Sequence, residues 1–329
     1  MRAGLLIGSL LLAASTCANA APERITPLVL LAEYPVLGMP SGNLSGLAQC
    51  GDELLAVSDR DDRHIYRLQV HEQTLQAEAL AIQVPPVPPS ALPWGVLARA
   101  WLAGPWRGGQ LDFEGISCDA AGNRYLLSEA RASVLRVDRQ GQGEWLRLPQ
   151  ALVRQARASG MLLQANALLE GIAVAEDGQR LWLAAERQRR GLLLTHWQGG
   201  RWRCLGNCVL LSESTPVPAP AVYGERRLPS SFNALSLHGE KLFTLEGHHW
   251  RLCRRHAQRA EVERCWSYGE FALDASRRYR LPYGMAEALQ VDAEGAWIGV
   301  DNGGQPRGDG EQRPIVWRVA APAHGWLAP

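Results

Sequence analysis

Lysine is almost absent from the sequence. Lys241 is the only one, so arginine supplies nearly all of the positive charge. Basic and acidic side chains number 34 and 33, which gives a formal net charge of +1. The chain therefore lacks the excess of positive charge that draws proteins to nucleic acids or to anionic membranes. We expect neither as a partner.

Long apolar runs are equally scarce. The one clear run spans residues 5–14, follows Arg2 and precedes Ala18-Asn19-Ala20. A basic residue, an apolar stretch and a small-x-small site, in that order, are typical of a secretory signal peptide. We expect residues 1–20 to be cleaved and residues 21–329 to be periplasmic or secreted. Since no other stretch approaches the ~20 apolar residues of a transmembrane helix, no membrane span is predicted.

Cysteine is present in a number that favours disulfide bonds. Cys17 falls within the predicted signal peptide, and six others remain: Cys50, Cys118, Cys204, Cys208, Cys253 and Cys265. An even number in an exported protein favours a disulfide framework, although six cysteines allow fifteen pairings. Short spacing favours Cys204 with Cys208 and Cys253 with Cys265, which leaves Cys50 for Cys118.

A short unit recurs along the chain. Each copy begins with a polar residue, a small residue and Leu or Ile, passes through a turn, and ends an apolar run on Asp or Glu. The copies span residues 45–59, 114–129, 170–186, 233–246 and 287–301. Repeats of this kind, with short alternating strands and turn residues, are typical of a β-propeller.

The repeat predicts an all-β fold in which residues 21–329 form a single propeller domain. We count five blades of four antiparallel strands, and a divergent sixth blade within residues 80–112 stays open. The apolar segments 28–31 and 315–319 are expected to pair and to close the ring, because closure removes exposed sheet edges. Residues 150–165 read as a short helix.

The polar positions of the repeat predict two rings of side chains. An antiparallel strand pair returns to the end that it left, so both positions reach the same mouth of the central channel. The first ring holds Ser45, Glu114, Glu170, Asn233 and Glu287. The second ring holds Asp59, Glu129, Glu186, Glu246 and Asp301.

So many facing carboxylates repel one another unless they are protonated or a cation compensates them. Oxygen donors alone suit Ca²⁺, whereas the absence of histidine and cysteine from both rings argues against zinc and copper. We therefore expect calcium to be held by Glu114, Glu170, Asn233 and Glu287, with the second ring as further candidate ligands. A competing interpretation is that the second-ring acids cap turns or pair with arginines such as Arg60, Arg131 and Arg187.

Several motifs carry a resemblance to a known family. They are DFEGI (residues 112–116), LLSEA (126–130), LLEGIA (168–173), YGMAEAL (283–289) and VDNG (300–303). Together they resemble the bacterial "esterase-like activity of phytase" family of secreted propellers. The resemblance implies acidic residues at the channel and an ester or phosphoester hydrolase. True β-propeller phytases carry many lysines and Asp-rich motifs that this chain lacks, so phytate hydrolysis is not expected.

No G-x-S-x-G motif occurs, which argues against a serine hydrolase. A metal-assisted hydrolase acting on a small molecule fits better, with Glu170, Glu186 or His248 as candidate catalytic groups. Arg187 is a candidate ligand for a phosphate or carboxylate of the substrate. Two alternatives remain: a lactonase-like enzyme that uses calcium, and a non-catalytic binding propeller with structural calcium. In each case we expect a monomer.

Overall fold

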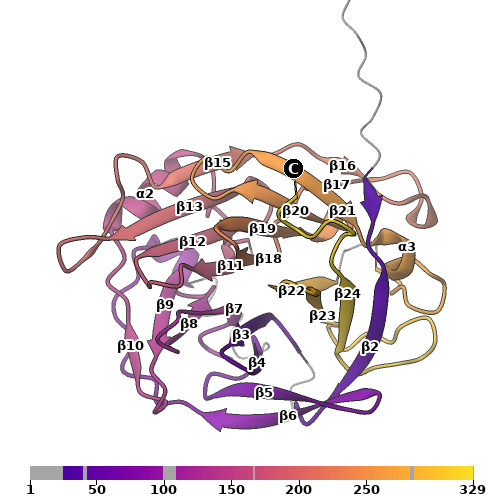
Figure 1. Cartoon of the computed structure of the whole chain (residues 1–329). Coiled ribbons are helices and arrows are strands. Elements are labelled where there is room, and N and C mark those ends of the chain that lie inside the picture. The colour runs from indigo at the N-terminus through magenta and orange to yellow at the C-terminus, as the bar shows by residue number, and fades with distance from the viewer. Residues whose placement is uncertain (1–24, 40–42, 99–108, 166, 282–284, 329) are drawn as a thin grey trace, which may run out of the picture.

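The computed structural model describes residues 25–39, 43–98, 109–165, 167–281 and 285–328. The predicted signal peptide lies outside these residues. Most of the described chain is β-strand, and the strands form antiparallel sheets arranged around a centre (Figure 1). The all-β propeller expected from the repeat is thereby confirmed.

Each repeat unit supplies the two inner strands of one sheet, and the strands that follow it complete the blade. The first sheet contains β3 (Gly46–Cys50), β4 (Glu53–Val57), β5 (His64–His71) and β6 (Thr74–Ala81). The second contains β7 (Phe113–Cys118), β8 (Arg124–Ser128), β9 (Ser133–Val137) and β10 (Gly143–Trp145). The third contains β11 (Leu169–Val174), β12 (Arg180–Ala185) and β13 (Arg190–Trp197), edged by β14 (Trp202–Arg203) and β15 (Val209–Glu213).

The fourth sheet contains β18 (Ala234–His238), β19 (Lys241–Glu246), β20 (Arg251–His256) and β21 (Val262–Ser267), with the short parallel strand β1 (Thr26–Pro27) at its edge. The fifth contains β22 (Ala286–Val291), β23 (Gly295–Val300), β24 (Ile315–Ala320) and β2 (Leu30–Leu37). The inner strands β3, β7, β11, β18 and β22 contact one another in this order, and β22 contacts β3. The described part of residues 80–112 contains no further sheet, and residues 99–108 lie outside the description.

The N-terminal strand closes the ring as expected. Strand β2 pairs antiparallel with β24, from Leu30 opposite Val319 to Pro35 opposite Ile315. Its last two residues then pair in parallel with β6, which joins the fifth sheet to the first. Both edges that an open ring would leave are therefore hydrogen-bonded.

The remaining elements are short. The helix predicted over residues 150–165 is present but shorter, as α2 (Gln150–Ala158), and α3 spans Gly269–Ala272. A two-stranded hairpin joins β16 (Val217–Pro218) to β17 (Arg227–Leu228), and single 3₁₀ turns span Ala221–Tyr223 and Gly247–His249. No helix among the described residues is long and apolar enough to cross a membrane.

The three disulfide bonds join the pairs that the spacing favoured. Cys50 and Cys118, whose Cα atoms lie 5.5 Å apart, link the first two blades at the ends of their inner strands. Cys253 bonds to Cys265 across β20 and β21 of the fourth blade. The third bond closes the loop between Cys204 and Cys208.

Candidate functional site

Three glutamates of the first ring occupy β-bulges. In each of β7, β11 and β22 the pairing register shifts by one residue at the glutamate: Glu114 lies between Phe113 and Gly115, and Glu170 and Glu287 lie at the equivalent points. Such a bulge leaves one residue unpaired and turns its side chain. No register shift occurs in β3 or β18, which follow Ser45 and Asn233. The bulges therefore single out the glutamates among the five first-ring positions.

The residue after each first-ring position is small because neighbouring inner strands approach closely there. A Cβ atom on Gly115 would lie 3.0 Å from Ile172 Cγ2, and one on Gly171 would lie 3.0 Å from the backbone nitrogen of Leu235. At this end of the inner strands, a small cavity lined by Ser45, Glu114 and Glu170 among others measures only about 10 Å³. That volume is close to a single water molecule. A cavity of that size does not admit an organic molecule.

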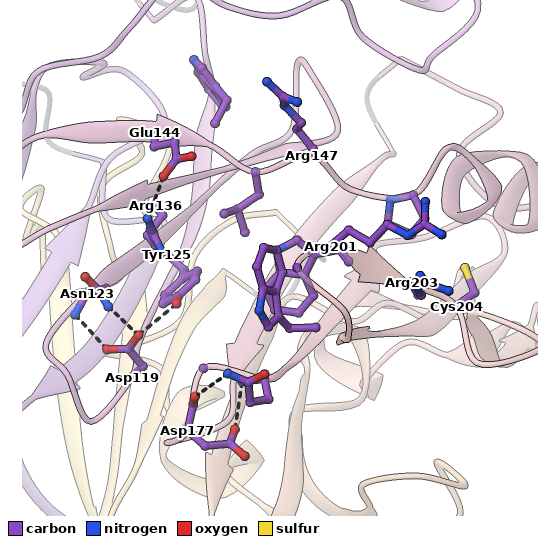
Figure 2. Close-up of a pocket in the computed structure, with 18 of the residues that line it drawn as sticks. Asp119, Asn123, Tyr125, Arg136, Glu144, Arg147, Asp177, Arg201, Arg203 and Cys204 are labelled. Atoms are coloured by element: carbon purple, nitrogen blue, oxygen red, sulfur yellow. Dashed lines mark hydrogen bonds and ion pairs between the residues drawn. The ribbon is translucent and has the colours of Figure 1, made fainter.

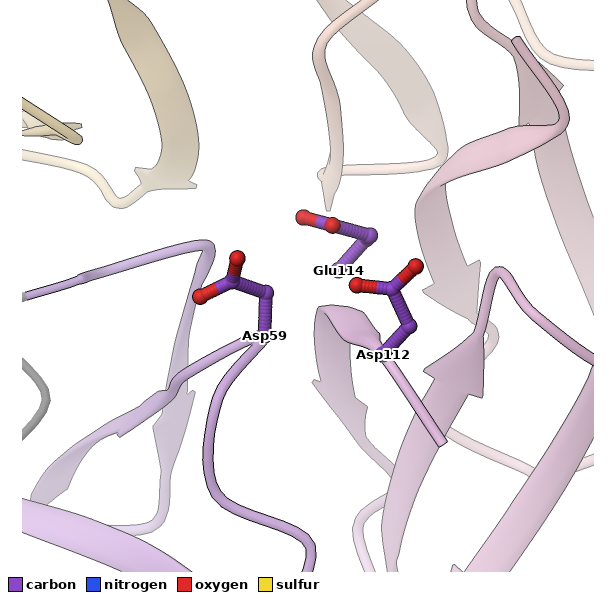
Figure 3. Close-up of side chains that lie close together, drawn as sticks. All are labelled: Asp59, Asp112 and Glu114. Carbon is purple, nitrogen blue, oxygen red and sulfur yellow. The ribbon is translucent and has the colours of Figure 1, made fainter. Parts of the chain in front are cut away.

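The first and second rings meet between blades. Oxygens of Asp59, Asp112 and Glu114 lie within 4.8 Å of one another, and Figure 3 shows the three side chains close together. Asp59 follows β4 of the first blade, whereas Asp112 and Glu114 come from the start of the second. Asp112 has a left-handed backbone conformation, with φ of 59°. We call these residues the first trio.

The second trio repeats this arrangement one blade further. It consists of Glu129, Glu170 and Glu186, whose oxygens again lie within 4.8 Å of one another. Glu129 is fixed by the backbone nitrogen of Leu168, which donates to its Oε1 at 3.0 Å. Glu186 contacts Arg187 through Oε1, and no described residue donates a hydrogen bond to its buried Oε2. A buried carboxylate oxygen without a donor is a natural cation ligand.

Burial and mutual repulsion keep the ring glutamates from ionising easily. Burial raises the pKa of Glu114 well above its usual value, and the carboxylates of Glu170 and Asp112 raise it further. Burial likewise raises the pKa of Glu170, with Glu129 and Glu287 adding to the effect. A divalent cation between these oxygens would remove the repulsion and replace the protons.

Glu287 and Asp301 form a looser acidic group in the fifth blade. Burial and the charge of Asp301 raise the pKa of Glu287. Asp301 itself accepts hydrogen bonds from Asn43 Nδ2 at 3.0 Å and from the Gly303 backbone nitrogen at 2.8 Å. Within the described residues neither acid completes a set of three close ligands.

Asn233 and Glu246 of the two rings are bound by neighbouring groups of the fold and do not face the channel mouth as cation ligands. Asn233 Oδ1 accepts hydrogen bonds from the Gly247 backbone nitrogen at 3.0 Å and from Ser231 Oγ at 2.7 Å. Both lone pairs of the amide oxygen are thus used, so the prediction of Asn233 as a calcium ligand is corrected.

Glu246 is the second correction. Its side chain is fully buried and is bound by Arg190 at 2.8 Å, Arg251 at 2.7 Å and Arg255 at 2.7 Å. These guanidinium groups overcome the effect of burial and hold the pKa of Glu246 far below its usual value. Three cations already compensate this carboxylate, so it has no need of calcium. The competing interpretation, that a second-ring acid pairs with arginines, is correct here.

Arg187 and His248 lie beside the acidic mouth. Arg187 contacts Glu186, and its charge lowers the pKa of both Glu170 and Glu287. His248 Nδ1 lies 2.6 Å from the carbonyl oxygen of Pro229. Because a carbonyl only accepts, Nδ1 carries the proton and Nε2 keeps the lone pair. Burial lowers the pKa of His248, which is therefore neutral near pH 7.

Asp112 is the site residue that sequence reasoning missed. The signal was available, because Asp112 opens the DFEGI motif two residues before Glu114. It falls outside the repeat, however, and only the left-handed turn of its backbone brings its carboxylate to the first trio.

Three comparisons relate the chain to known proteins. A family model described as "Phytase-like: Esterase-like activity of phytase" matches residues 39–201, as the motifs predicted. No curated protein sequence matches the chain.

Solved structures resemble the chain only distantly. The glutaminyl cyclase of Myxococcus xanthus is 12% identical with a TM-score of 0.49, covering 89% of this chain and 97% of its own. The PQQ-bound aldose sugar dehydrogenase of Streptomyces coelicolor is 15% identical with a TM-score of 0.41, covering 88% and 97%. A gluconolactonase of Xanthomonas campestris is 9% identical with a TM-score of 0.39, covering 92% and 99%. At these scores the fold assignment rests on the strand pairing of the chain itself.

Proposed function

Because the chain matches the family described as esterase-like activity of phytase over residues 39–201, we propose that it is an exported, calcium-dependent hydrolase of esters or phosphoesters. The substrate is a small molecule bound at the acidic mouth. In this proposal the mature chain, residues 21–329, acts as a monomeric single domain. The three disulfide bonds support an oxidising compartment, either the periplasm or the medium.

The observation that carries the proposal is the pair of carboxylate trios on consecutive blades. Both are built only from oxygen donors, and Glu186 Oε2 is buried with no donor among the described residues. Carboxylates alone, at separations up to 4.8 Å, fit a hard cation of flexible coordination such as Ca²⁺. Glu114 and Asp112 would hold it in the first trio, and Glu170 with Glu129 in the second.

Bound calcium would polarise the carbonyl or phosphoryl oxygen of the substrate. The residues of the chain supply the rest. Arg187 lies at the edge of the second trio, where its guanidinium group can bind a carboxylate or phosphate of the substrate. Glu186 offers an acceptor for a proton of an attacking water, and His248 offers its unprotonated Nε2. The cavity beside Glu114 and Glu170, about 10 Å³ in volume, is too small to admit the substrate.

Turnover of chromogenic esters tests this proposal. We expect the protein to hydrolyse p-nitrophenyl acetate or p-nitrophenyl phosphate in calcium and to stop in chelator. Glu170→Gln and Asp112→Asn should each lower kcat/KM by at least ~10–100-fold, the loss typical even of residues that only support a metal ligand. The matched control is Glu261→Gln, whose carboxylate is 64% exposed in a surface ion pair with Arg259. Turnover unaffected by chelator and by both site variants would refute the calcium-dependent mechanism.

A non-catalytic binding propeller remains the second candidate, because the trios by themselves equally explain a structural ion. It predicts that calcium raises Tm while none of the esters, phosphate esters or simple lactones is hydrolysed. Hydrolysis of lactones alone would favour the lactonase-like alternative. Measuring calcium content, Tm and turnover on the same preparation separates the three outcomes.

A further inference from the structure

A large surface groove lies between the second and third blades, away from the acidic mouth. Its volume is about 1150 Å³, and Figure 2 shows side chains of both blades facing it. Asp119 and Asp177 lie in the turns that follow β7 and β11, whereas Glu114 and Glu170 lie at the beginnings of these strands. The groove therefore occupies the opposite end of the strands from the site proposed above.

Three arginines line the groove without partners. Arg147 and Arg201 are exposed, and Arg203 on β14 is half-buried. Among the described residues, none of the three forms an ion pair or donates a side-chain hydrogen bond, and Arg203 Nε is fully shielded from solvent. Arg136, at the same groove, shows the contrast, because Glu144 binds it at 2.6 Å. Unpaired guanidinium groups facing one groove favour an anionic ligand with carboxylate, sulfate or phosphate groups.

Aromatic side chains line the same groove. Trp197 ends β13 and is 40% exposed, so much of its ring is open to a ligand. The ring is held against Trp202 in an edge-on contact, with 5.7 Å between centroids. A fixed and partly exposed indole offers an apolar face to a flat ligand surface, such as the C–H face of a sugar ring.

Carboxylates on the same walls narrow the class of ligand. Asp177 is exposed; its Oδ1 accepts a hydrogen bond from the backbone nitrogen of Gln179, and no described residue donates to its Oδ2. These carboxylates favour a ligand that carries hydrogen-bond donors beside its anionic groups, because a carboxylate accepts hydrogen bonds. A saccharide donates hydroxyl hydrogen bonds to such carboxylates, while its own acidic groups bind the arginines.

We propose that this groove binds an anionic oligosaccharide. Arg147, Arg201 and Arg203 bind its carboxylate or sulfate groups, Trp197 packs against a sugar ring, and Asp177 accepts hydroxyl hydrogen bonds. This binding is independent of the calcium-dependent reaction, because the groove shares no residue with the two trios.

Titration calorimetry with defined probes tests the proposal. Two probes are acidic saccharides: tetragalacturonate supplies carboxylates, and a heparin-derived tetrasaccharide supplies sulfates. Two are controls: maltotetraose is a neutral saccharide, and oligothymidylate is a polyanion whose units are joined by phosphates instead of glycosidic bonds. We expect saturable binding of one or both acidic tetrasaccharides and at least ~10-fold weaker binding of maltotetraose, since loss of the guanidinium contacts corresponds to about 1.4 kcal/mol or more. The double variant Arg147→Gln/Arg201→Gln should weaken acidic binding at least ~10-fold, and Trp197→Ala should also weaken it.

Matched controls keep the test decisive. Arg259→Gln removes an exposed arginine elsewhere, and Trp94→Ala removes a tryptophan that is 83% exposed and outside the groove lining. Both controls should bind like wild type, and the groove variants should keep their Tm within about 1 °C and their ester turnover. Absence of binding to both acidic saccharides, equal binding of maltotetraose, or tighter binding of oligothymidylate would each overturn the proposal.

Discussion

Replacing Glu170 with glutamine should change stability in opposite directions with and without calcium. In the cation-free protein, oxygens of Glu170, Glu129 and Glu186 lie within 4.8 Å of one another. At that separation and an effective dielectric constant of about 20, two ionised carboxylates repel by roughly 3.5 kcal/mol. The substitution removes two of the three repulsions in the second trio while keeping the shape of the side chain.

Protonation limits how much this repulsion can cost. Burial and neighbouring carboxylates raise the pKa of Glu170, so in the absence of cation the group takes up a proton instead. With an ordinary value of 4.5 in the unfolded chain, holding that proton at pH 7 costs at most about 3.4 kcal/mol, at 1.36 kcal/mol per pH unit. Glu170→Gln should therefore stabilise the cation-free protein at pH 7 by up to about 3 kcal/mol. For a chain of this length that is about 5 °C in Tm.

The pH dependence has a defined sign. A raised pKa in the folded state means that stability is fully present below the unfolded value of 4.5 and is lost as the pH rises toward the raised value. The gain from Glu170→Gln should accordingly vanish near pH 4.5 and increase toward pH 7.

Calcium should reverse the order of stability between Glu170→Gln and wild type. At ~100 times its Kd, the ion should stabilise wild type by about 2.7 kcal/mol, and Glu170→Gln should lose most of that gain. Scanning calorimetry in chelator and in calcium, at pH 4.5 and at pH 7, measures the stability difference between variant and wild type under each condition. Glu261→Gln is the exposed control. A variant that is less stable than wild type in chelator at pH 7, or that keeps the full calcium shift, would show that the trio is not a cation site.

Three further predictions concern the fold that positions the site. Glu246→Gln removes the charge that pairs with buried Arg190 and Arg255 and half-buried Arg251, so it should cost about 3–5 kcal/mol and lower Tm by about 5–8 °C in thermal unfolding. Because the pKa of Glu246 is lowered by folding, this difference from wild type should be full above pH 4.5 and shrink as the pH falls; an undiminished difference at low pH would contradict the ion-pair account. Gly171→Ala places a Cβ 3.0 Å from the Leu235 backbone nitrogen and should cost about 1–3 kcal/mol in urea unfolding, with a weaker calcium shift. Cys50→Ala/Cys118→Ala opens a 68-residue separation and should cost up to about 4 kcal/mol, while intact-mass analysis of wild type should find no free thiol among the six cysteines before reduction.

Much of the fold could be predicted from the sequence because its determinants are local. The alternation of short apolar runs and turn residues sets the strands of each blade, and the recurrence of one unit sets their repetition. Closure by the two terminal segments follows from the need to pair sheet edges, and β2 with β24 satisfies it. Spacing alone favoured the disulfide pairs, since two of them close short loops.

The position of the candidate site could be predicted in the same way, but its ligand sets could not. The repeat brings Glu114 and Glu170 to one mouth, because antiparallel strands return to the end that they left. It does not reveal that a β-bulge turns each of these side chains, since a one-residue shift in register leaves no pattern in the residue types. Nor does it reveal Asp112, which lies outside the repeat and has a left-handed backbone conformation.

The sequence by itself determined that this chain is a repeated β-structure with carboxylates converging at one end of its strands. Only the tertiary structure decided which of them meet. Asp59 of one blade joins Glu114 of the next, whereas Glu246 is neutralised by Arg190, which lies 56 residues earlier. Two acids at equivalent places in the repeat thus have opposite surroundings. The physical reason is that residues outside the repeated unit, on neighbouring blades and on the next strand of the same blade, fix the distances over which charges act.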